Sequence, residues 1–294
     1  MNRWLGFAYL AYRHAGWLLR RRAPLVAALK LTMRCNLNCR HCPWTQDQTQ
    51  DLSTPAWMQI MKDLSRQGVL HVVLEGGEPT LRDDLQELIV CGKQLGMRVT
   101  IATNGTKSLH RYTPDRFLIS VDGLEKQHDA LRGQGAFALL MKNLSSTSLP
   151  KVALISLSQE NVDQVLPILE TFSEHLDGFW YSFVYDYRGQ PQLALNRAQK
   201  QKVAKILLQA MSSFNIVNTR SFLKQVGIPR KCRPWMLTTV TADGRQHSGC
   251  MVEALESCVC ELCDLPCHRE LSDLLEPRFM WDHLKTSFKK SWLR

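Results

Sequence analysis

Between residues 27 and 184 the sequence alternates short apolar runs with longer amphipathic stretches, and this alternation restricts the folds open to the chain. The apolar runs have the length of buried strands, and the stretches between them carry apolar residues at helical spacing, for example Trp57, Ile60, Met61 and Leu64. Repeated strand and helix units of this kind predict a parallel α/β sheet with its helices outside. The six predicted strands are residues 27–32, 69–74, 98–102, 117–121, 152–157 and 178–184.

Beyond residue 189 the alternation stops, and the pattern predicts a change of organisation along the chain. A helix is expected over residues 196–212, and from residue 231 the sequence becomes rich in cysteine and loses regular periodicity. The predicted segments are a basic amphipathic helix at 1–24, a strand and helix domain at 25–190, a helical connection at 191–230, a cysteine-rich module at 231–270 and a tail at 271–294.

The composition excludes a disordered chain and points to bound metal. With 294 residues, of which 45% are hydrophobic, the chain can bury a large core. Its ten cysteines cluster at 35–42 and 232–267, with only Cys91 alone. Clustered thiols in a chain of this size favour metal ligation over a disulfide framework.

The net charge of +10 is concentrated near the N-terminus, where eight basic residues precede the first acidic residue, Asp47. On a helical projection, residues 1–22 place most apolar side chains on one arc and most arginines on the other. Such a helix can lie on a membrane surface, pack on the protein's own body or, as the least favoured reading, contact nucleic acid. We find no stretch long enough to span a bilayer and expect a cytoplasmic protein, peripheral to the membrane if the first reading holds.

Three thiols crowd into the stretch MRCNLNCRHCPW, where Cys35, Cys39 and Cys42 follow the first predicted strand with the spacing CxxxCxxC. Thiolates bind zinc, copper or iron-sulfur clusters. A closed zinc site needs a fourth ligand, and His41 is poorly suited because it adjoins Cys42. Three thiolates on a 4Fe-4S cluster would instead leave one iron open to another ligand.

Further motifs follow at the ends of the next strands: EGGEP at 75–79, TNGT at 103–106 and SVDG at 120–123. Each motif alone is compatible with an ordinary turn. In this order, after CxxxCxxC, they resemble the radical S-adenosylmethionine (radical SAM) superfamily, and the resemblance covers roughly residues 27–190. It implies a partial (β/α)6 TIM-like parallel barrel with a small cysteine-rich C-terminal module.

The resemblance also implies a cofactor site at the rim of that barrel. Cys35, Cys39 and Cys42 would hold a 4Fe-4S cluster, and the methionine end of S-adenosylmethionine would chelate the open iron. Two glycines at 76 and 77 would let a bulky ligand approach the backbone, and a carboxylate at 78 would accept from its ammonium group. The residues implied to bind the cofactor are His41, Gly76, Gly77, Glu78, Pro79, Thr103, Asn104, Ser120 and Asp122. For Arg82 and Arg132, contact with the cofactor and a structural ion pair stay open as alternatives.

The activity implied by the resemblance is reductive cleavage of S-adenosylmethionine to a 5′-deoxyadenosyl radical, which abstracts hydrogen from a substrate. The substrate is not predicted; a peptide or protein, a small molecule and a lipid-linked compound are all compatible with the family. A low-potential flavodoxin or ferredoxin type of electron donor is implied as partner. The alternatives are a non-catalytic iron-sulfur or electron-transfer protein on the same fold and a zinc-dependent binding protein, whereas a nucleic-acid binder is disfavoured because the basic residues form no stripe through the cysteines.

A second cysteine cluster follows a predicted hairpin that turns at Asp243 and Gly244. It resembles, in part, the SPASM and twitch extensions of the superfamily, which carry auxiliary 4Fe-4S clusters. The resemblance implies one auxiliary cluster, with a structural zinc site involving His247 or His268 as the alternative. The implied ligands are Cys232 and Cys250 with two or three of Cys260, Cys263 and Cys267, while Cys258 is expected to take no part.

Overall fold

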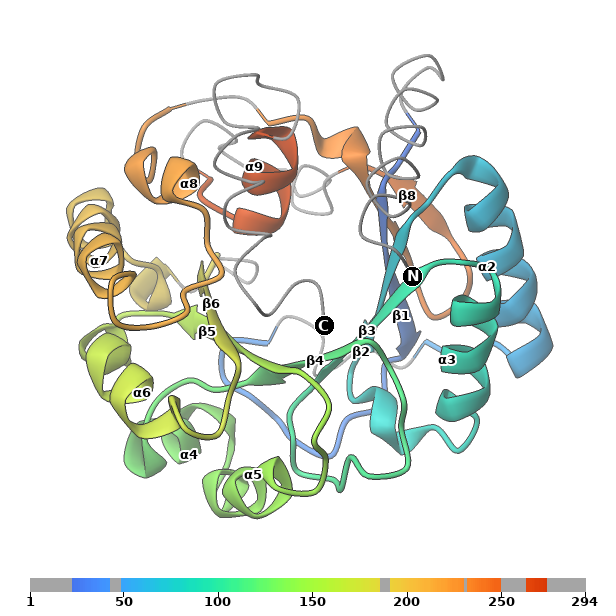
Figure 1. The fold of residues 1–294 in the computed structure, drawn as a ribbon, viewed down its shortest axis with the longest axis horizontal. Helices are drawn as coiled ribbons and strands as arrows, with labels where there is room; N and C mark the ends of the chain where they lie inside the picture. Colours follow the sequence, from blue (N-terminus) through green and yellow to red (C-terminus); the bar gives the residue numbers. More distant parts are fainter. Residues whose placement is uncertain (1–22, 43–48, 186–190, 230–231, 250–262, 274–294) are drawn as a thin grey trace.

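Parallel strands in the predicted order form the centre of the computed structural model, which describes residues 23–42, 49–185, 191–229, 232–249 and 263–273. Each of the six predicted strands is confirmed with small changes at its ends. Figure 1 looks along the axis of the resulting barrel, in which the strands form an open arc. They are β1 (Val26–Thr32), β2 (His71–Gly76), β3 (Arg98–Thr103), β4 (Arg116–Ser120), β5 (Lys151–Leu157) and β6 (Gly178–Phe183).

Helices cover the outer face of the arc because one side of each strand and one stripe of each helix are apolar. In α2 the fully buried residues are Trp57, Met61 and Leu64, which match the predicted stripe, whereas Ile60 is only partly buried. The facing strand β1 contributes Leu29 and Leu31, each with no exposed surface. The covering helices are α2 (Thr54–Gln67), α3 (Leu85–Gln94), α4 (Glu125–Arg132), α5 (Ala136–Leu144) and α6 (Val165–Phe172).

The predicted hairpin is confirmed, but it belongs to the barrel sheet. Strands β7 (Leu237–Val240) and β8 (Gln246–Ser248) pair antiparallel around Gly244, whose φ of 86° suits glycine. Strand β7 also pairs in parallel with β1, which gives the strand order β6-β5-β4-β3-β2-β1-β7-β8. The hairpin therefore hydrogen-bonds to the edge of β1 that would otherwise be open.

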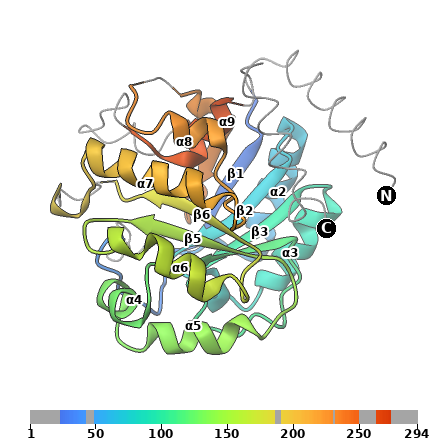
Figure 2. The same cartoon turned by 60° about the vertical axis from the view of Figure 1, so that its left-hand side comes forward.

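The opposite edge of the arc, at β6, is paired by an irregular segment rather than by a strand. Phe179 forms a bridge with Ile216, and the Asn218 side chain both accepts from the Tyr181 N–H (2.8 Å) and donates to its carbonyl (2.9 Å). This segment connects α7 (Arg197–Ala210), which confirms the predicted helix, to α8 (Arg220–Lys224). Helices α6 and α7 lie over the outer side of this end of the sheet (Figure 2).

Helix α9 (Pro266–Asp273) lies at the opening of the arc, between the segments next to its two ends (Figure 1). On the β6 side, the Glu270 carboxylate accepts from Trp180 Nε1 (3.2 Å) and from the Thr219 N–H (2.8 Å). On the β7 side, the Arg233 N–H donates to Ser272 Oγ (2.6 Å). Helix α9 thus lies across the opening between the two ends of the eight-stranded sheet and is hydrogen-bonded to segments beside both.

Two sequence predictions fall outside this description. The amphipathic helix expected at 1–24 and most of the tail expected at 271–294 lie outside the described residues. Within the ranges that the structure describes, no helix is long and apolar enough to cross a bilayer.

Glu270 should make the docking of α9 dependent on pH. Burial raises the pKa of Glu270 to about 8, against the hydrogen bonds from Thr219 and Trp180. Because the pKa of the Glu270 carboxyl is higher in the folded protein than in the unfolded chain, its protonation stabilises the fold. This contribution is complete at pH values below the unfolded-state pKa and is lost as pH rises towards 8. We expect the unfolding free energy, measured in urea from pH 5 to pH 9, to fall by about 4 kcal/mol more in the wild type than in Glu270→Gln. Exposed Glu174→Gln should retain the wild-type profile; a parallel profile for Glu270→Gln would contradict the assignment.

Candidate functional site

The cysteine loop, defined as residues 33–42, leaves the carboxyl end of β1 and places its three thiols at different depths. Cys35 is exposed, Cys42 is half-buried and Cys39 is buried. The Cys42 N–H donates to the Cys39 carbonyl (3.1 Å), and the Leu37 N–H donates to Cys35 Sγ (3.4 Å). Burial raises the pKa of Cys35 and raises that of Cys39 to about 11, which favours the neutral thiols, and a bound cation would favour the thiolates.

The two glycines of the GGEP loop, residues 76–79, lie against the cysteine loop itself. A Cβ at Gly76 would come within 2.2 Å of the Thr32 carbonyl oxygen, and one at Gly77 within 2.2 Å of the Arg34 carbonyl oxygen. This close approach allows the Gly77 N–H to donate to Thr32 O (2.7 Å) and the Glu78 N–H to Arg34 O (2.9 Å). From the sequence, these glycines were explained by the approach of a ligand to the backbone. In the structure, the backbone of residues 32–34 approaches them, so that explanation was incomplete.

The carboxylate of Glu78 joins the GGEP loop to the end of β3. It has no exposed surface and accepts from the Thr80 N–H (3.1 Å) and Oγ1 (2.6 Å), from Thr103 Oγ1 (2.8 Å) and from the Asn104 N–H (2.7 Å). Burial raises its pKa, and these donors oppose that rise. Three of the four hydrogen bonds fall on Oε1, so Oε2 retains capacity for one further donor.

Asparagine side chains tie the cysteine loop to the β3 end. Asn104 Nδ2 donates to Asn36 Oδ1 (3.0 Å) and lies 4.0 Å from Cys35 Sγ, while Asn36 Nδ2 donates to Thr106 Oγ1 (2.8 Å). Sequence reasoning identified Asn104 but not Asn36 or Thr106 as site residues. The signal for Asn36 was its position inside the cysteine motif, where a short polar side chain can reach a neighbouring loop.

A buried ion pair lies under Cys39 at the end of β4. Asp122 accepts from Arg132 Nε at Oδ2 (2.6 Å) and from the Ser156 N–H at Oδ1 (3.0 Å), and His41 Nε2 lies 3.6 Å from Oδ2. Burial opposes ionisation of Asp122, but the Arg132 guanidinium together with His41, His128 and the Ser156 N–H outweighs burial and holds the pKa of that carboxyl below its usual range. The structure shows the ion pair that was one of the alternatives for Arg132, with the side chain buried against Asp122.

The stretch HDALRG, residues 128–133, forms the end of α4 and its C-cap and hydrogen-bonds to the elements around Asp122. Its residues His128 and Asp129 were not identified from the sequence. His128 Nδ1 accepts from the Asp122 N–H (3.2 Å), and burial lowers the pKa of this imidazole to about 4, which keeps it neutral. Asp129 accepts from the Gly135 and Phe137 N–H groups at the start of α5. The Leu131 carbonyl accepts from the Arg40 N–H (2.9 Å). The short run thus braces β4, α5 and the cysteine loop.

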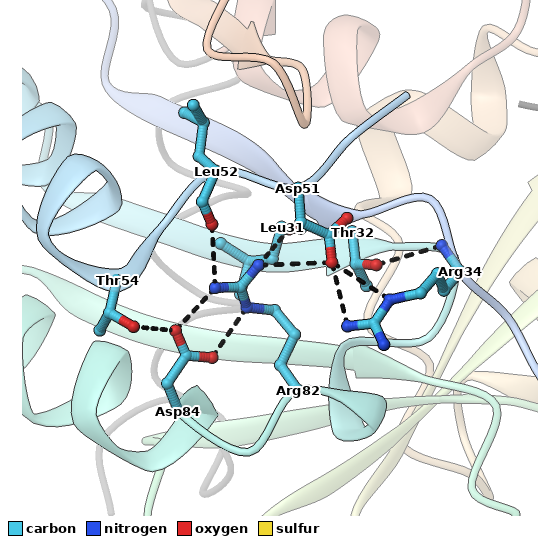
Figure 3. Close-up of polar contacts among 8 residues, drawn as sticks. All are labelled: Leu31, Thr32, Arg34, Asp51, Leu52, Thr54, Arg82 and Asp84. Carbon is cyan, nitrogen blue, oxygen red and sulfur yellow. Dashed lines mark hydrogen bonds and ion pairs between the residues drawn. The ribbon is translucent and has the colours of Figure 1, made fainter. Parts of the chain in front are cut away.

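Arg82 has a structural role too, shown in Figure 3. Its guanidinium donates to the carbonyls of Leu31 (3.0 Å) and Leu52 (3.1 Å) and forms a two-point ion pair with Asp84. The adjacent Asp51 accepts from Arg34 Nε and Nη2 at 3.2 and 3.0 Å. This network fixes the base of the cysteine loop to the segment before α2.

The remaining predicted residues fall into two groups. Pro79 is buried at the start of a short 3-10 turn, and Ser120 is half-buried at the last position of β4. Cys232, Cys263 and Cys267 are half-buried around α9, whose Arg269 Nε donates to the Cys263 carbonyl, while Cys250, Cys258 and Cys260 lie outside the described residues.

The donor set fits a cluster better than one ion. Among the described residues, no three His, Cys, Asp or Glu side chains are arranged to hold a single metal ion. A 4Fe-4S cluster requires no such convergence, because each thiolate binds a different iron. The N–H donors near Cys35 and Cys39 also match sulfur atoms that carry negative charge.

Comparison with known proteins identifies the family. The Radical SAM superfamily model matches residues 29–176, half of the chain's 294 residues, and the chain belongs to this superfamily. The sporulation killing factor maturation protein SkfB of Bacillus subtilis (strain 168) is 31% identical over 160 residues, covering 50% of this chain and 39% of SkfB. Fe-coproporphyrin III synthase of Methanosarcina barkeri (strain Fusaro / DSM 804) is 32% identical over 180 residues, covering 56% and 45%.

The fold has a solved counterpart in Streptococcus suis SuiB bound to S-adenosylmethionine, with a TM-score of 0.67 at 16% identity. That match covers 88% of this chain and 68% of SuiB, and it confirms the predicted α/β partial-barrel fold. The matched regions amount to less than half the length of the two curated relatives.

The contact between the glycines and the cysteine loop predicts a steric effect at Gly77. Gly77→Ala should lower the unfolding free energy by about 3 kcal/mol or more, because the new Cβ meets backbone that cannot rotate away. Urea denaturation of the metal-free protein measures this change. Gly96→Ala is the matched control: it has φ of 74° but open space, so it should cost only about 1 kcal/mol. An equal or smaller loss for Gly77→Ala would contradict the contact.

Proposed function

We propose that the chain is a radical SAM enzyme with a 4Fe-4S cluster on Cys35, Cys39 and Cys42. The observation that carries the proposal is the packing of the cysteine loop, which is hydrogen-bonded to the GGEP loop, the β3 end and the α4 end together. These elements come from four separate parts of the sequence and meet only at the carboxyl end of the barrel. Ligand and cofactor sites of parallel barrels collect at that end.

Different residues of the chain would hold the 4Fe-4S cluster and S-adenosylmethionine. The three thiols would ligate three irons and leave the fourth for S-adenosylmethionine. Glu78 Oε2 has capacity for one ammonium hydrogen, while the rest of its carboxylate holds Thr80 and Thr103 in place. Ser120, Asn104, Pro79 and His41 would border the cofactor from neighbouring strand ends.

With the cluster held by Cys35, Cys39 and Cys42, bound S-adenosylmethionine would supply radical chemistry through its reductive cleavage. The protein then has to orient the substrate and exclude water rather than supply an acid or base. The interior positions of β1 and β2 near this end carry an ion pair between Lys30 and Glu75 (3.3 Å), which is suited to recognising a polar substrate group. No other described pair places opposite charges on adjacent strands there.

The substrate class is proposed from the relatives. SkfB is named as a maturation protein, and SuiB was also solved with its precursor peptide SuiA, whereas another relative is a porphyrin synthase. We favour a peptide or protein substrate over a small molecule or a lipid-linked one. The electron would come from a flavodoxin or ferredoxin type of donor, and residues 1–22 would contact a membrane surface from the cytoplasmic side.

An auxiliary 4Fe-4S cluster is proposed for the C-terminal cysteines. Cys263 and Cys267 lie four residues apart at the start of α9, and Cys232 precedes Arg233, which bonds to Ser272 of the same helix. Three of the proposed ligands are therefore carried by segments that meet at α9. Cys250 and Cys260 would complete the set from outside the described residues.

The primary cluster is tested by cofactor cleavage. Anaerobic protein reconstituted with iron and sulfide, then given dithionite and S-adenosylmethionine, should release 5′-deoxyadenosine, and Cys35→Ala should reduce release to background. Cys91→Ala is the matched control, since Cys91 lies on α3 away from the motif and should leave turnover unchanged. Wild-type release no higher than that of Cys35→Ala would favour a non-catalytic iron-sulfur protein.

Metal content tests the auxiliary cluster. The full chain should contain about eight iron atoms and no zinc, and Cys263→Ser with Cys267→Ser should remove about four irons while leaving 5′-deoxyadenosine release measurable. Elemental analysis of anaerobic protein measures both metals. About four irons with one zinc per chain would replace the auxiliary cluster with a zinc site.

A further inference from the structure

The buried pair of Arg132 and Asp122 has a geometry that reaches the cysteine loop. Arg132 donates through Nε to Asp122 Oδ2 at 2.6 Å, and its Nη1 lies 3.9 Å from Cys39 Sγ, within hydrogen-bond reach of sulfur. Arg132 and Asp122 side chains are 9% and 0% exposed, so water screens neither charge well.

The three thiols of the cysteine loop have unequal surroundings. Cys35 receives neutral donors, the Leu37 N–H and the Asn104 amide, whereas Cys39 faces a full positive charge. The guanidinium of Arg132 therefore favours negative charge on the Cys39 sulfur and on any group bound to it.

We infer that Arg132 is a positioning residue that raises the reduction potential of a cluster bound through Cys39, and that Asp122 sets the size of this effect. The inference rests on the proposed function, because it requires the 4Fe-4S cluster at the cysteine loop. Reduction adds one electron to the cluster without a bond change, and a nearby buried cation stabilises that electron. Asp122 partly neutralises the cation and so limits the rise.

Because Arg132 and Asp122 carry opposite charges, removing each of them should shift the reduction potential in opposite directions. Arg132→Met removes the cation and should lower the reduction equilibrium constant about tenfold, equivalent to about 59 mV for a one-electron couple. Asp122→Asn leaves the guanidinium uncompensated and should raise the constant by a similar factor. Loss of packing alone would not move the two variants in opposite directions.

Arg40 offers a matched control in the same loop. It is adjacent to Cys39 in sequence, but its side chain is 58% exposed and pairs with Glu160 (2.8 Å) at the surface. Arg40→Gln removes the same charge as Arg132→Met, and solvent screening should keep its effect below about twofold.

The experiment is an EPR-monitored redox titration of the full chain with dithionite and mediators, without S-adenosylmethionine, followed on the signal that Cys35→Ala lacks. Iron content and near-ultraviolet circular dichroism establish that each variant is loaded and folded. Arg132→Lys keeps the positive charge, so its reduction potential should shift less than that of Arg132→Met. If Arg132→Met binds no cluster, the comparison is made between Arg132→Lys and Asp122→Asn.

The two levels of the proposal fail in different ways. If the wild type shows no cluster signal that depends on Cys35, the proposed function fails. If the wild-type signal is present but Arg132→Met and Asp122→Asn stay within twofold of the wild type, or shift in the same direction, the role of Arg132 is overturned.

Discussion

The close backbone contact between the cysteine loop and the GGEP loop is the constraint on which the site depends. Gly77 and Glu78 donate their N–H groups to carbonyls of the segment that leads into the cysteines, and a Cβ at Gly76 or Gly77 would come within 2.2 Å of those carbonyl oxygens. This contact extends the pairing of β1 with β2 beyond the strands themselves. The position of the first cysteine is thereby set by the same hydrogen bonding that sets the register of the sheet.

From that contact a series of buried polar groups spreads to the neighbouring strand ends. Glu78 holds the β3 end, Asn104 and Asn36 hold the outer side of the cysteine loop, and Asp122 with Arg132 lies beneath its buried cysteine. Each group is satisfied mainly by atoms from another element, so removing one would leave a buried partner without compensation. The loop that carries the thiols is consequently held by hydrogen bonds from several elements of the barrel.

The open side of the barrel is covered by segments that take no part in the buried polar contacts around the cysteine loop. Strand β7 pairs with β1, Asn218 pairs with the β6 edge, and α9 connects the two through Glu270 and Ser272. Because α9 also carries Cys267 and follows Cys263, closure of the barrel and the placement of the C-terminal cysteines depend on the same helix. A metal bound by these cysteines would stabilise the closure by mass action.

The sequence by itself determined the positions of the strands along the chain, the helical stripe at Trp57, Met61 and Leu64, and the candidate residues that follow successive strands, because hydrophobic periodicity and motif order are local properties. It also fixed the hairpin at Gly244. The partners of buried charges were decided by tertiary structure alone: Arg82 turned to Asp84 and to main-chain carbonyls, and Arg132 to Asp122 and Cys39. The pairing of β7 with β1 was decided in the same way, since contacts between residues about 200 positions apart depend on how the whole chain closes.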